Sequence, residues 1–281
     1  MHKPSWFQTR IAPLLLPSAV LVAGCTSSVA APGSGTTTAP TSSQGPGTTT
    51  APASASGTAP PLALVYQGPG ACEGCETALA DLLARAGLRT RFIGPAELRS
   101  DEAFADATLY AQPGGDETML VRDAVGAADW PAAAARITRF VQGGGRYLGV
   151  CLGGFLAARW VDDAGTIPAL RLISGEGDYF RGTPIDPNAD QVIPVHWLLP
   201  ETERAMYFQG GPFFAEQAGT VYARYADGTI AALATSYGQG KVAVSGVHFE
   251  APAEWYSSNG LHDADGLDAD LGLRMIQDLV R

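Results

Sequence analysis

The sequence RYLGVCLGG at residues 146–154 decides which fold class this chain adopts. Its first five residues have the apolar character of a buried strand, and two glycines follow directly after Cys151 and Leu152. We therefore predict a strand that ends on Cys151 and turns sharply into a helix. A side chain at the tip of such a strained turn is held accessible, and the next backbone N–H can stabilise an oxyanion. Cys151 is a candidate nucleophile; the alternative is a structural cysteine, because cysteine is among the most buried residue types.

A second apolar strand is predicted at residues 242–247, and His248 and Glu250 follow it. A cysteine nucleophile needs a base, and the base needs a group that orients it. Residues two apart on a strand point to the same side, so we expect His248 and Glu250 to supply both groups to Cys151. The structural alternatives are a core histidine bonded to backbone and a glutamate that caps the following turn.

Residues 1–24 have the features of an export signal. Lys3 and Arg10 make the start basic, and the apolar run at residues 11–22 is too short to span a bilayer. The run ends in small residues before Cys25, which resembles a bacterial lipobox. This resemblance implies cleavage before Cys25, diacylation of its sulfur with a chain such as palmitate, and a lipoprotein at the extracytoplasmic face of the cell membrane. An ordinary signal peptide with an incidental cysteine is the alternative.

Residues 25–61 and residues 62–281 differ in composition. After Cys25, nearly every residue up to residue 61 is Thr, Ser, Ala, Gly or Pro, with no charge and no aromatic ring. Such a segment buries too little apolar surface to offset chain entropy, so we predict a disordered tether. Residues 62–281 are long enough for one sizeable core and form the predicted folded domain.

The charge of the chain excludes one class of partner. Residues 1–24 hold two of the 18 Lys and Arg residues and none of the 28 Asp and Glu residues, so their removal takes the formal net charge from −10 to −12. A nucleic-acid partner would need a basic footprint, which this balance does not provide.

The glycines at residues 143–145 precede a strand instead of opening a helix, so they are not a phosphate-binding fingerprint. The acidic run at residues 263–270 lacks the spacing of an EF-hand. We predict no cofactor and no metal.

The first half of the domain alternates between strand and helix patterns. Strands are predicted at residues 62–67, 88–93, 108–112 and 146–150, and helices at residues 75–86, 96–105 and 132–142. This alternation is typical of a mostly parallel sheet with helices on both faces.

The second half of the domain changes to strand patterns separated by hairpin turn signals. These strands are predicted at residues 171–180, 191–197, 204–208, 221–225, 230–235 and 242–247. A closing amphipathic helix follows at residues 267–280, with one apolar face made of Leu267, Leu271, Met275 and Leu279. The sequence therefore predicts an α/β domain whose doubly wound, mostly parallel sheet has an antiparallel extension.

Cys72 and Cys75 form a Cys-Glu-Gly-Cys motif after the first strand and at the start of a helix. In the cytosol this motif would suggest thioredoxin-like chemistry, because a helix N-terminus lowers the pKa of a thiol. Outside the membrane, a short-loop disulfide is the favoured interpretation. The loop follows the carboxyl end of its strand, as Cys151 does, so the pair is a candidate for shaping or regulating the Cys151 pocket.

Five segments in this order are similar to the class I glutamine amidotransferase superfamily, and most similar within it to the domain at the N-terminus of some biotin–protein ligases. They are VYQGPG at residues 65–70, QPGGD at 112–116, YLGVCLGGF at 147–155, YFQGGPFF at 207–214 and HFE at 248–250. The resemblance implies a flavodoxin-like fold and a triad of Cys151, His248 and Glu250. It also implies an oxyanion hole built from the backbone N–H of Leu152 and one from Gly114 or Gly115.

Phe155 is a departure from the resemblance. Glutamine-hydrolysing members commonly carry a glutamine four residues after the nucleophile, where it helps to hold the substrate. Losing that polar contact disfavours glutamine itself as the substrate. We expect Phe155, Phe213 and Phe214 to line the substrate pocket, and Gly210 and Gly211 to let the substrate approach.

These expectations combine into one function. The chain is predicted to be a membrane-tethered hydrolase that acts on an amide C–N bond of a small molecule or peptide through Cys151, His248 and Glu250. One alternative is a non-catalytic small-molecule-binding or redox-sensing module with a vestigial site. A third hypothesis is a thiol–disulfide protein that works through Cys72 and Cys75.

Overall fold

The computed structural model describes residues 59–161, 165–175, 177–182, 185–186 and 189–281. The predicted signal segment, the predicted lipidation site Cys25 and most of the predicted tether lie outside these residues. Residues Ala59–Arg281 belong to one compact folded unit.

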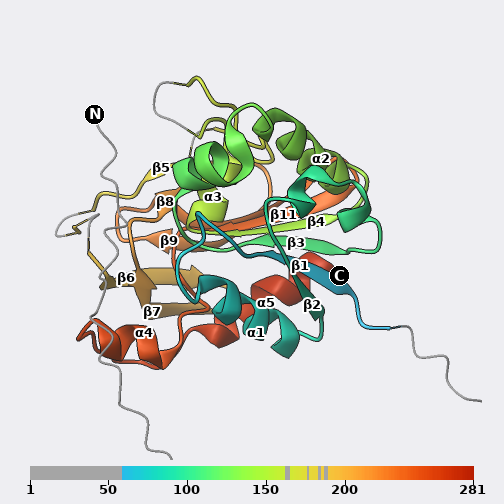
Figure 1. Ribbon diagram of the computed structural model, residues 1–281. Coiled ribbons are helices and arrows are strands. Elements are labelled where there is room, and N and C mark those ends of the chain that lie inside the picture. Colours follow the sequence, from blue (N-terminus) through green and yellow to red (C-terminus); the bar gives the residue numbers. More distant parts are fainter. Residues whose placement is uncertain (1–58, 162–164, 176, 183–184, 187–188) are drawn as a thin grey trace, which may run out of the picture. The chain divides into compact units, whose positions relative to one another are not determined.

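Within the described residues the fold is built on a nine-stranded sheet in the order β2-β1-β3-β4-β11-β10-β9-β6-β7 (Figure 1). The first five of these strands run parallel, as predicted. They are β2 (Arg89–Ile93), β1 (Leu62–Tyr66), β3 (Leu109–Gln112), β4 (Arg146–Val150) and β11 (Gly240–Ser245).

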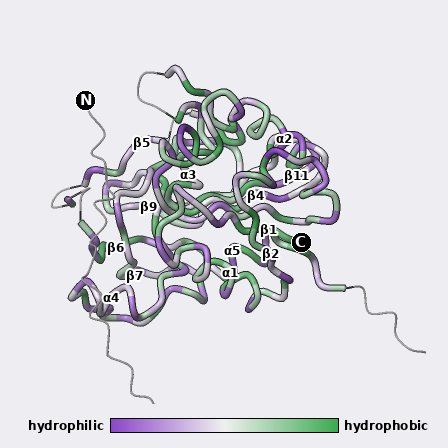
Figure 2. Tube along the Cα trace, viewed as in Figure 1, coloured by the Kyte–Doolittle hydropathy of each residue, from purple (hydrophilic) through white to green (hydrophobic). Residues whose placement is uncertain are grey.

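Helices cover both faces of the parallel strands (Figure 1). One face carries α1 (Cys75–Arg85) and α5 (Ala269–Val280), and the other carries α2 (Trp130–Gln142) and α3 (Leu152–Ala157). Strand β1 shows why: Leu64 and Tyr66 belong to one core cluster, while Ala63 and Val65 belong to the other. Side chains alternate between the two faces of a strand, so an uninterrupted apolar run must be covered on both sides. Figure 2 shows hydrophobic residues gathered along these strands.

The remaining strands form the antiparallel extension. They are β10 (Ile230–Tyr237), β9 (Thr220–Tyr225), β6 (Gln191–Leu198) and β7 (Glu201–Phe208). Tight turns join the hairpins at Gly228 and Gly238, both with positive φ, as the turn signals indicated. A separate two-stranded ladder pairs β5 (Asp178–Tyr179) with β8 (Pro212–Phe213).

Two predicted elements were wrong. The helix expected at residues 96–105 is a pair of 3₁₀ turns, Glu97–Arg99 and Glu102–Phe104. Ser100 between them is extended, and its hydroxyl bonds Glu102 instead of continuing a helix. The strand expected at residues 171–180 is reduced to β5, because Arg171 and Gly175 both have positive φ and interrupt an extended chain.

The sequence patterns also missed a π-helical segment at Met119–Gly126 and the short helix α4 (Ala253–Ser258). In α5, Leu271, Met275 and Leu279 are buried as expected. Leu267 does not belong to that face, because it precedes the helix and is 42% exposed.

The chain after β11 packs against the chain after β7 through two glycines. A Cβ added to Gly211 would overlap the carbonyl oxygen of Gly246. The two backbones therefore approach more closely than any side chain allows. This contact places the residues that follow β11 beside the residues that follow β7.

We predict that Gly211→Ala lowers the free energy of unfolding by about 3 kcal/mol, because backbone must move to admit the methyl group. Gly260→Ala is the control, since Gly260 has open space around it and a φ of 66°. Its loss should reflect the left-handed backbone alone, about 1 kcal/mol. Urea unfolding measures both variants. Equal losses, or a larger loss for Gly260→Ala, would show that the two backbones are not in close contact.

Candidate active site

Cys151 occupies the sharp turn between β4 and α3, with φ 50° and ψ −103°. Positive φ is uncommon for residues other than glycine, and such strain persists only where the surroundings enforce it. Two glycines provide those surroundings: a Cβ on Gly149 would overlap the Gly153 carbonyl, and a Cβ on Gly153 would overlap the Gln112 carbonyl. The backbones of β3, β4 and α3 are therefore in direct contact beneath Cys151.

The Cys151 side chain is 5% exposed. Its Sγ lies 3.7 Å from the carbonyl oxygen of Gln209, within the range of a weak S–H hydrogen bond. The Cys151 N–H donates to the Ser245 carbonyl at 2.8 Å, which joins the end of β4 to the end of β11. Among the described residues, Cys151 is the one cysteine with a free thiol.

His248 and Glu250 lie together in the turn after β11, not on the strand. The Glu250 carboxylate contacts His248 Nδ1 at 2.9 Å. The Ala251 N–H donates to the His248 carbonyl at 3.2 Å, and the His248 N–H donates to the Tyr207 carbonyl at 3.0 Å. Strand alternation was therefore the wrong reason for their proximity, since β11 ends at Ser245 and the turn brings the two side chains together.

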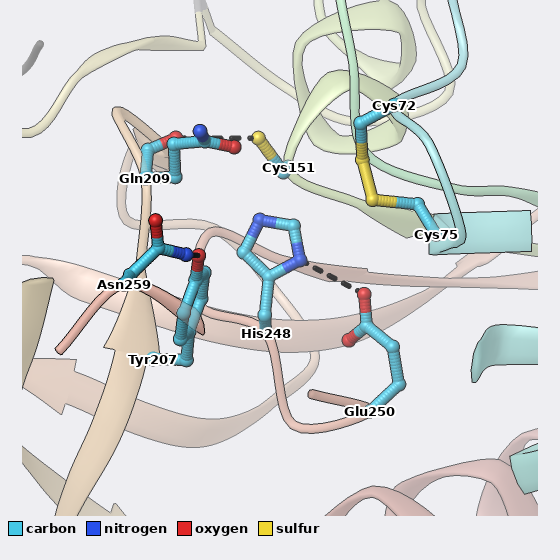
Figure 3. Close-up of a disulfide and its surroundings, with 8 residues drawn as sticks. All are labelled: Cys72, Cys75, Cys151, Tyr207, Gln209, His248, Glu250 and Asn259. Atoms are coloured by element: carbon cyan, nitrogen blue, oxygen red, sulfur yellow. Dashed lines mark hydrogen bonds and ion pairs between the residues drawn. A yellow bond between two sulfur atoms is a disulfide. The ribbon is translucent and has the colours of Figure 1, made fainter. Parts of the chain in front are cut away.

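Both members of this pair are buried, at 1% exposure for His248 and 6% for Glu250. Burial by itself lowers the pKa of His248. The charge of Glu250 and hydrogen bonding with Cys151 and Glu250 outweigh it and raise the pKa of His248 to about 10. The imidazole therefore holds a proton at neutral pH. Figure 3 shows Nδ1 directed at Glu250 and the other ring nitrogen on the side toward Cys151.

Gly114 lies where the cysteine, the histidine and the Cys72 sulfur meet. A Cβ added to it would stand 2.7 Å from His248 Cε1, 3.2 Å from Cys72 Sγ and 3.5 Å from Cys151 Cβ. The loop after β3 thus reaches the ends of β4 and β11, as parallel strands with aligned carboxyl ends require. Any side chain at position 114 would push the imidazole away.

The three residues predicted to supply oxyanion donors differ in their surroundings. Leu152 is the first residue of α3, where helical N–H groups have no partner within the helix. Gly114 adjoins Cys151, and its carbonyl accepts from the Cys72 N–H at 3.0 Å. Gly115 lies against the preceding loop, since a Cβ there would overlap the Gly70 carbonyl. Of the two predicted glycines, Gly114 is therefore the one beside Cys151.

The residues expected to contact substrate are mostly used in packing. Phe155 packs on Tyr179 with 4.7 Å between ring centroids and is 5% exposed. Phe213 pairs with Asp178 in the ladder of β5 and β8, and Phe214 is buried. Gly211 is needed for packing and not for substrate access, because its backbone lies against the backbone of Gly246. Gly210 has a φ of 57° between β7 and β8.

Tyr207 and Trp255 flank the imidazole, and the sequence patterns did not identify them. Both rings meet His248 edge to face, with centroids 5.9 Å and 5.6 Å away. Asn259 donates to the Tyr207 hydroxyl at 3.1 Å. Trp255 belongs to α4, whose start was interpreted only as a turn, so no signal marked it as a neighbour of the site. The Gln209 contact could not be predicted either, because it uses a backbone carbonyl.

Cys72 and Cys75 are joined by a disulfide, with Cα atoms 5.4 Å apart. Both are buried. Figure 3 shows this disulfide on the side of Cys151 opposite Gln209.

His196 bonds Glu203 on the antiparallel extension and His262 is exposed, so neither joins the site. Among the residues that the structure describes, no group of three acidic, histidine or cysteine side chains is arranged to hold a metal.

Comparisons with known proteins agree with this fold. Residues 62–172 match the family model described as "Biotin-protein ligase, N terminal", which includes Cys151 and ends before His248. The PurLQS structure from Thermotoga maritima superposes with a TM-score of 0.53 and 16% identity, covering 79% of this chain and 100% of that one. A glutamine amidotransferase from Thermotoga maritima gives 0.52 and 13% identity, covering 79% of this chain and 98% of that one. No curated protein matches the chain.

The fold is therefore similar to that of these two Thermotoga maritima structures, with a flavodoxin-like parallel sheet extended by antiparallel strands. Identity at this level shows the fold alone. The chemistry must be argued from the site itself.

We predict that His248 makes stability depend on pH. A pKa raised from 6.5 to about 10 stabilises the folded state fully below pH 6.5, and this stabilisation is lost as the pH rises toward 10. The advantage of wild type over His248→Gln in free energy of unfolding should thus shrink by a few kcal/mol, in order of magnitude, between pH 6 and pH 10. Urea unfolding at both pH values measures this, with His196→Gln as a control for losing a histidine. An advantage that stays constant would contradict a buried imidazolium.

Proposed function

We propose that this chain is a cysteine-dependent hydrolase that cleaves an amide C–N bond with Cys151, His248 and Glu250. The observation that carries the proposal is the meeting of a strained, buried cysteine with a buried His–Glu pair around Gly114. Strain and a raised histidine pKa in one place favour chemistry over a structural role. The glutamine amidotransferase-like fold supports this class of reaction as an analogy.

Each residue has a defined role in the proposed reaction. The Cys151 sulfur attacks the amide carbonyl and forms a thioester, while His248 gives its proton to the leaving nitrogen. A water molecule, deprotonated by His248, then attacks the thioester and releases the carboxylic acid and the thiol. Glu250 holds Nδ1, so that Nε2 faces the reacting atoms. The N–H groups of Leu152 and Gly114 stabilise the oxyanion.

The substrate is a small-molecule or peptide amide other than free glutamine. Phe155 supports this limit, because its ring packs on Tyr179 where a glutamine side chain would offer an amide. The aromatic rings of Tyr207 and Trp255 lie next to His248. These surfaces suit a substrate with an apolar part beside the amide.

We further propose that the domain works outside the cytoplasm, held to the membrane by a lipid on Cys25. The basic start, the short apolar run and the small residues before Cys25 support this proposal. In the part of the chain that the structure describes, no helix has the length and apolar character needed to cross a membrane.

The test is ammonia release from a panel of primary amides, with free glutamine and carboxamide-bearing cell-wall peptides included. We expect release from one or more peptide amides, its loss in Cys151→Ala, and a loss of about 10²-fold or more in Glu250→Gln, which mispositions the base. Glu203→Gln is the control, since Glu203 bonds His196 far along the antiparallel extension. Release that persists in Cys151→Ala, or no release from any amide, would reject a cysteine amidohydrolase.

A further inference from the structure

A second sulfur centre adjoins Cys151 and is not used by the proposed hydrolysis. The Cys72 sulfur of the Cys72–Cys75 disulfide and the Cys151 side chain both lie close to Gly114. Cys72 Sγ and Cys151 Cβ lie 3.2 Å and 3.5 Å from the same point, the position of a Cβ on residue 114. The two atoms are therefore separated by less than the sum of those distances. Because residue 114 is glycine, it places no side chain of its own next to these two atoms.

The Cys151 side chain can rotate so that its sulfur faces Cys72. Its Sγ now faces the Gln209 carbonyl through a 3.7 Å contact, which is weak for a hydrogen bond. Figure 3 shows Cys151 between Gln209 and the disulfide. Rotation about the Cα–Cβ bond moves the sulfur from the Gln209 side toward the Cys72 side, and staggered rotamers make this a discrete step.

The groups needed for thiol–disulfide exchange are assembled around this space. The protonated His248 ring adjoins both Gly114 and Cys151, so its charge favours the thiolate form of Cys151 that exchange requires. Cys75 is the first residue of the eleven-residue helix α1, so a thiolate released there lies at the positive end of a helix dipole. Glu76 in the same turn works against this effect, but it is partly exposed and its charge is screened.

We propose that Cys151 exchanges with this disulfide inside one molecule. The Cys151 thiolate attacks Cys72 Sγ, a Cys151–Cys72 bond forms, and the Cys72–Cys75 bond breaks to leave Cys75 as the thiolate. One disulfide and one thiol exist before and after the step, so no external oxidant or reductant is needed. The activity is distinct from amide hydrolysis and does not depend on it. While the exchanged form persists, Cys151 cannot attack a carbonyl.

The experiment uses the full chain with Cys25→Ser, which leaves Cys72, Cys75 and Cys151 as its cysteines. The oxidised protein is incubated without reductant, blocked in its native state with N-ethylmaleimide, and mapped by mass spectrometry of unreduced peptides. We expect the label on both Cys151 and Cys75, together with a Cys72–Cys151 linked peptide. The added Cys151→Ser change is the control and should leave Cys75 unlabelled.

A matched pair of variants tests the geometry separately. In Cys75→Ser, glutathione disulfide should drive formation of a Cys72–Cys151 bond within the monomer. In Cys72→Ser, the Cys75–Cys151 bond should form at least tenfold more slowly, because Cys72 is the sulfur beside Gly114. Absence of a Cys72–Cys151 bond in both the parent chain and Cys75→Ser would overturn the proposal. Equal rates in the two variants would overturn the assignment of Cys72 as the attacked sulfur.

Discussion

The contact between the backbones of Gly149 and Gly153 is the constraint on which the site depends. It lets α3 begin directly over the end of β4, where a Cβ on either residue would overlap neighbouring carbonyl groups. The Tyr147 hydroxyl donates to the Gly153 carbonyl at 2.7 Å and secures the turn from below. Cys151, between the two glycines, is left with a positive φ. The strained conformation of the candidate nucleophile is thus a consequence of glycine packing.

The rest of the site follows from three parallel strands that end at one edge of the sheet. The loop after β3 supplies Gly114, β4 supplies Cys151, and the turn after β11 supplies His248 and Glu250. At each of the three ends, a glycine allows another segment to approach closely. The His–Glu pair is buried, so its electrostatic interaction is only weakly screened by solvent, and the pKa of His248 rises despite desolvation.

The parallel half of the fold could be predicted from sequence because its strands are short apolar runs separated by helices and glycines. Cys151, His248 and Glu250 could be singled out by residue type and order, although the strand argument for His248 was wrong. Tyr207 and Trp255 could not be found this way, since their contact with His248 depends on how α4 folds back. Gly211 looked like a substrate contact because a glycine pattern does not say which backbone approaches it. The strand predicted at residues 171–180 was wrong, because the pattern of apolar residues does not reveal that Arg171 has a positive φ.

The proposed chemistry depends on activation of Cys151 by His248. The most direct measurement is the rate of iodoacetamide alkylation near pH 6, in wild type and His248→Ala, with the modified cysteine identified by mass spectrometry. We expect fast alkylation at Cys151 in wild type and a rate at least tenfold lower in the variant, because an imidazolium stabilises the thiolate. Equally slow alkylation in both proteins, with the pH profile of an ordinary thiol, would contradict it.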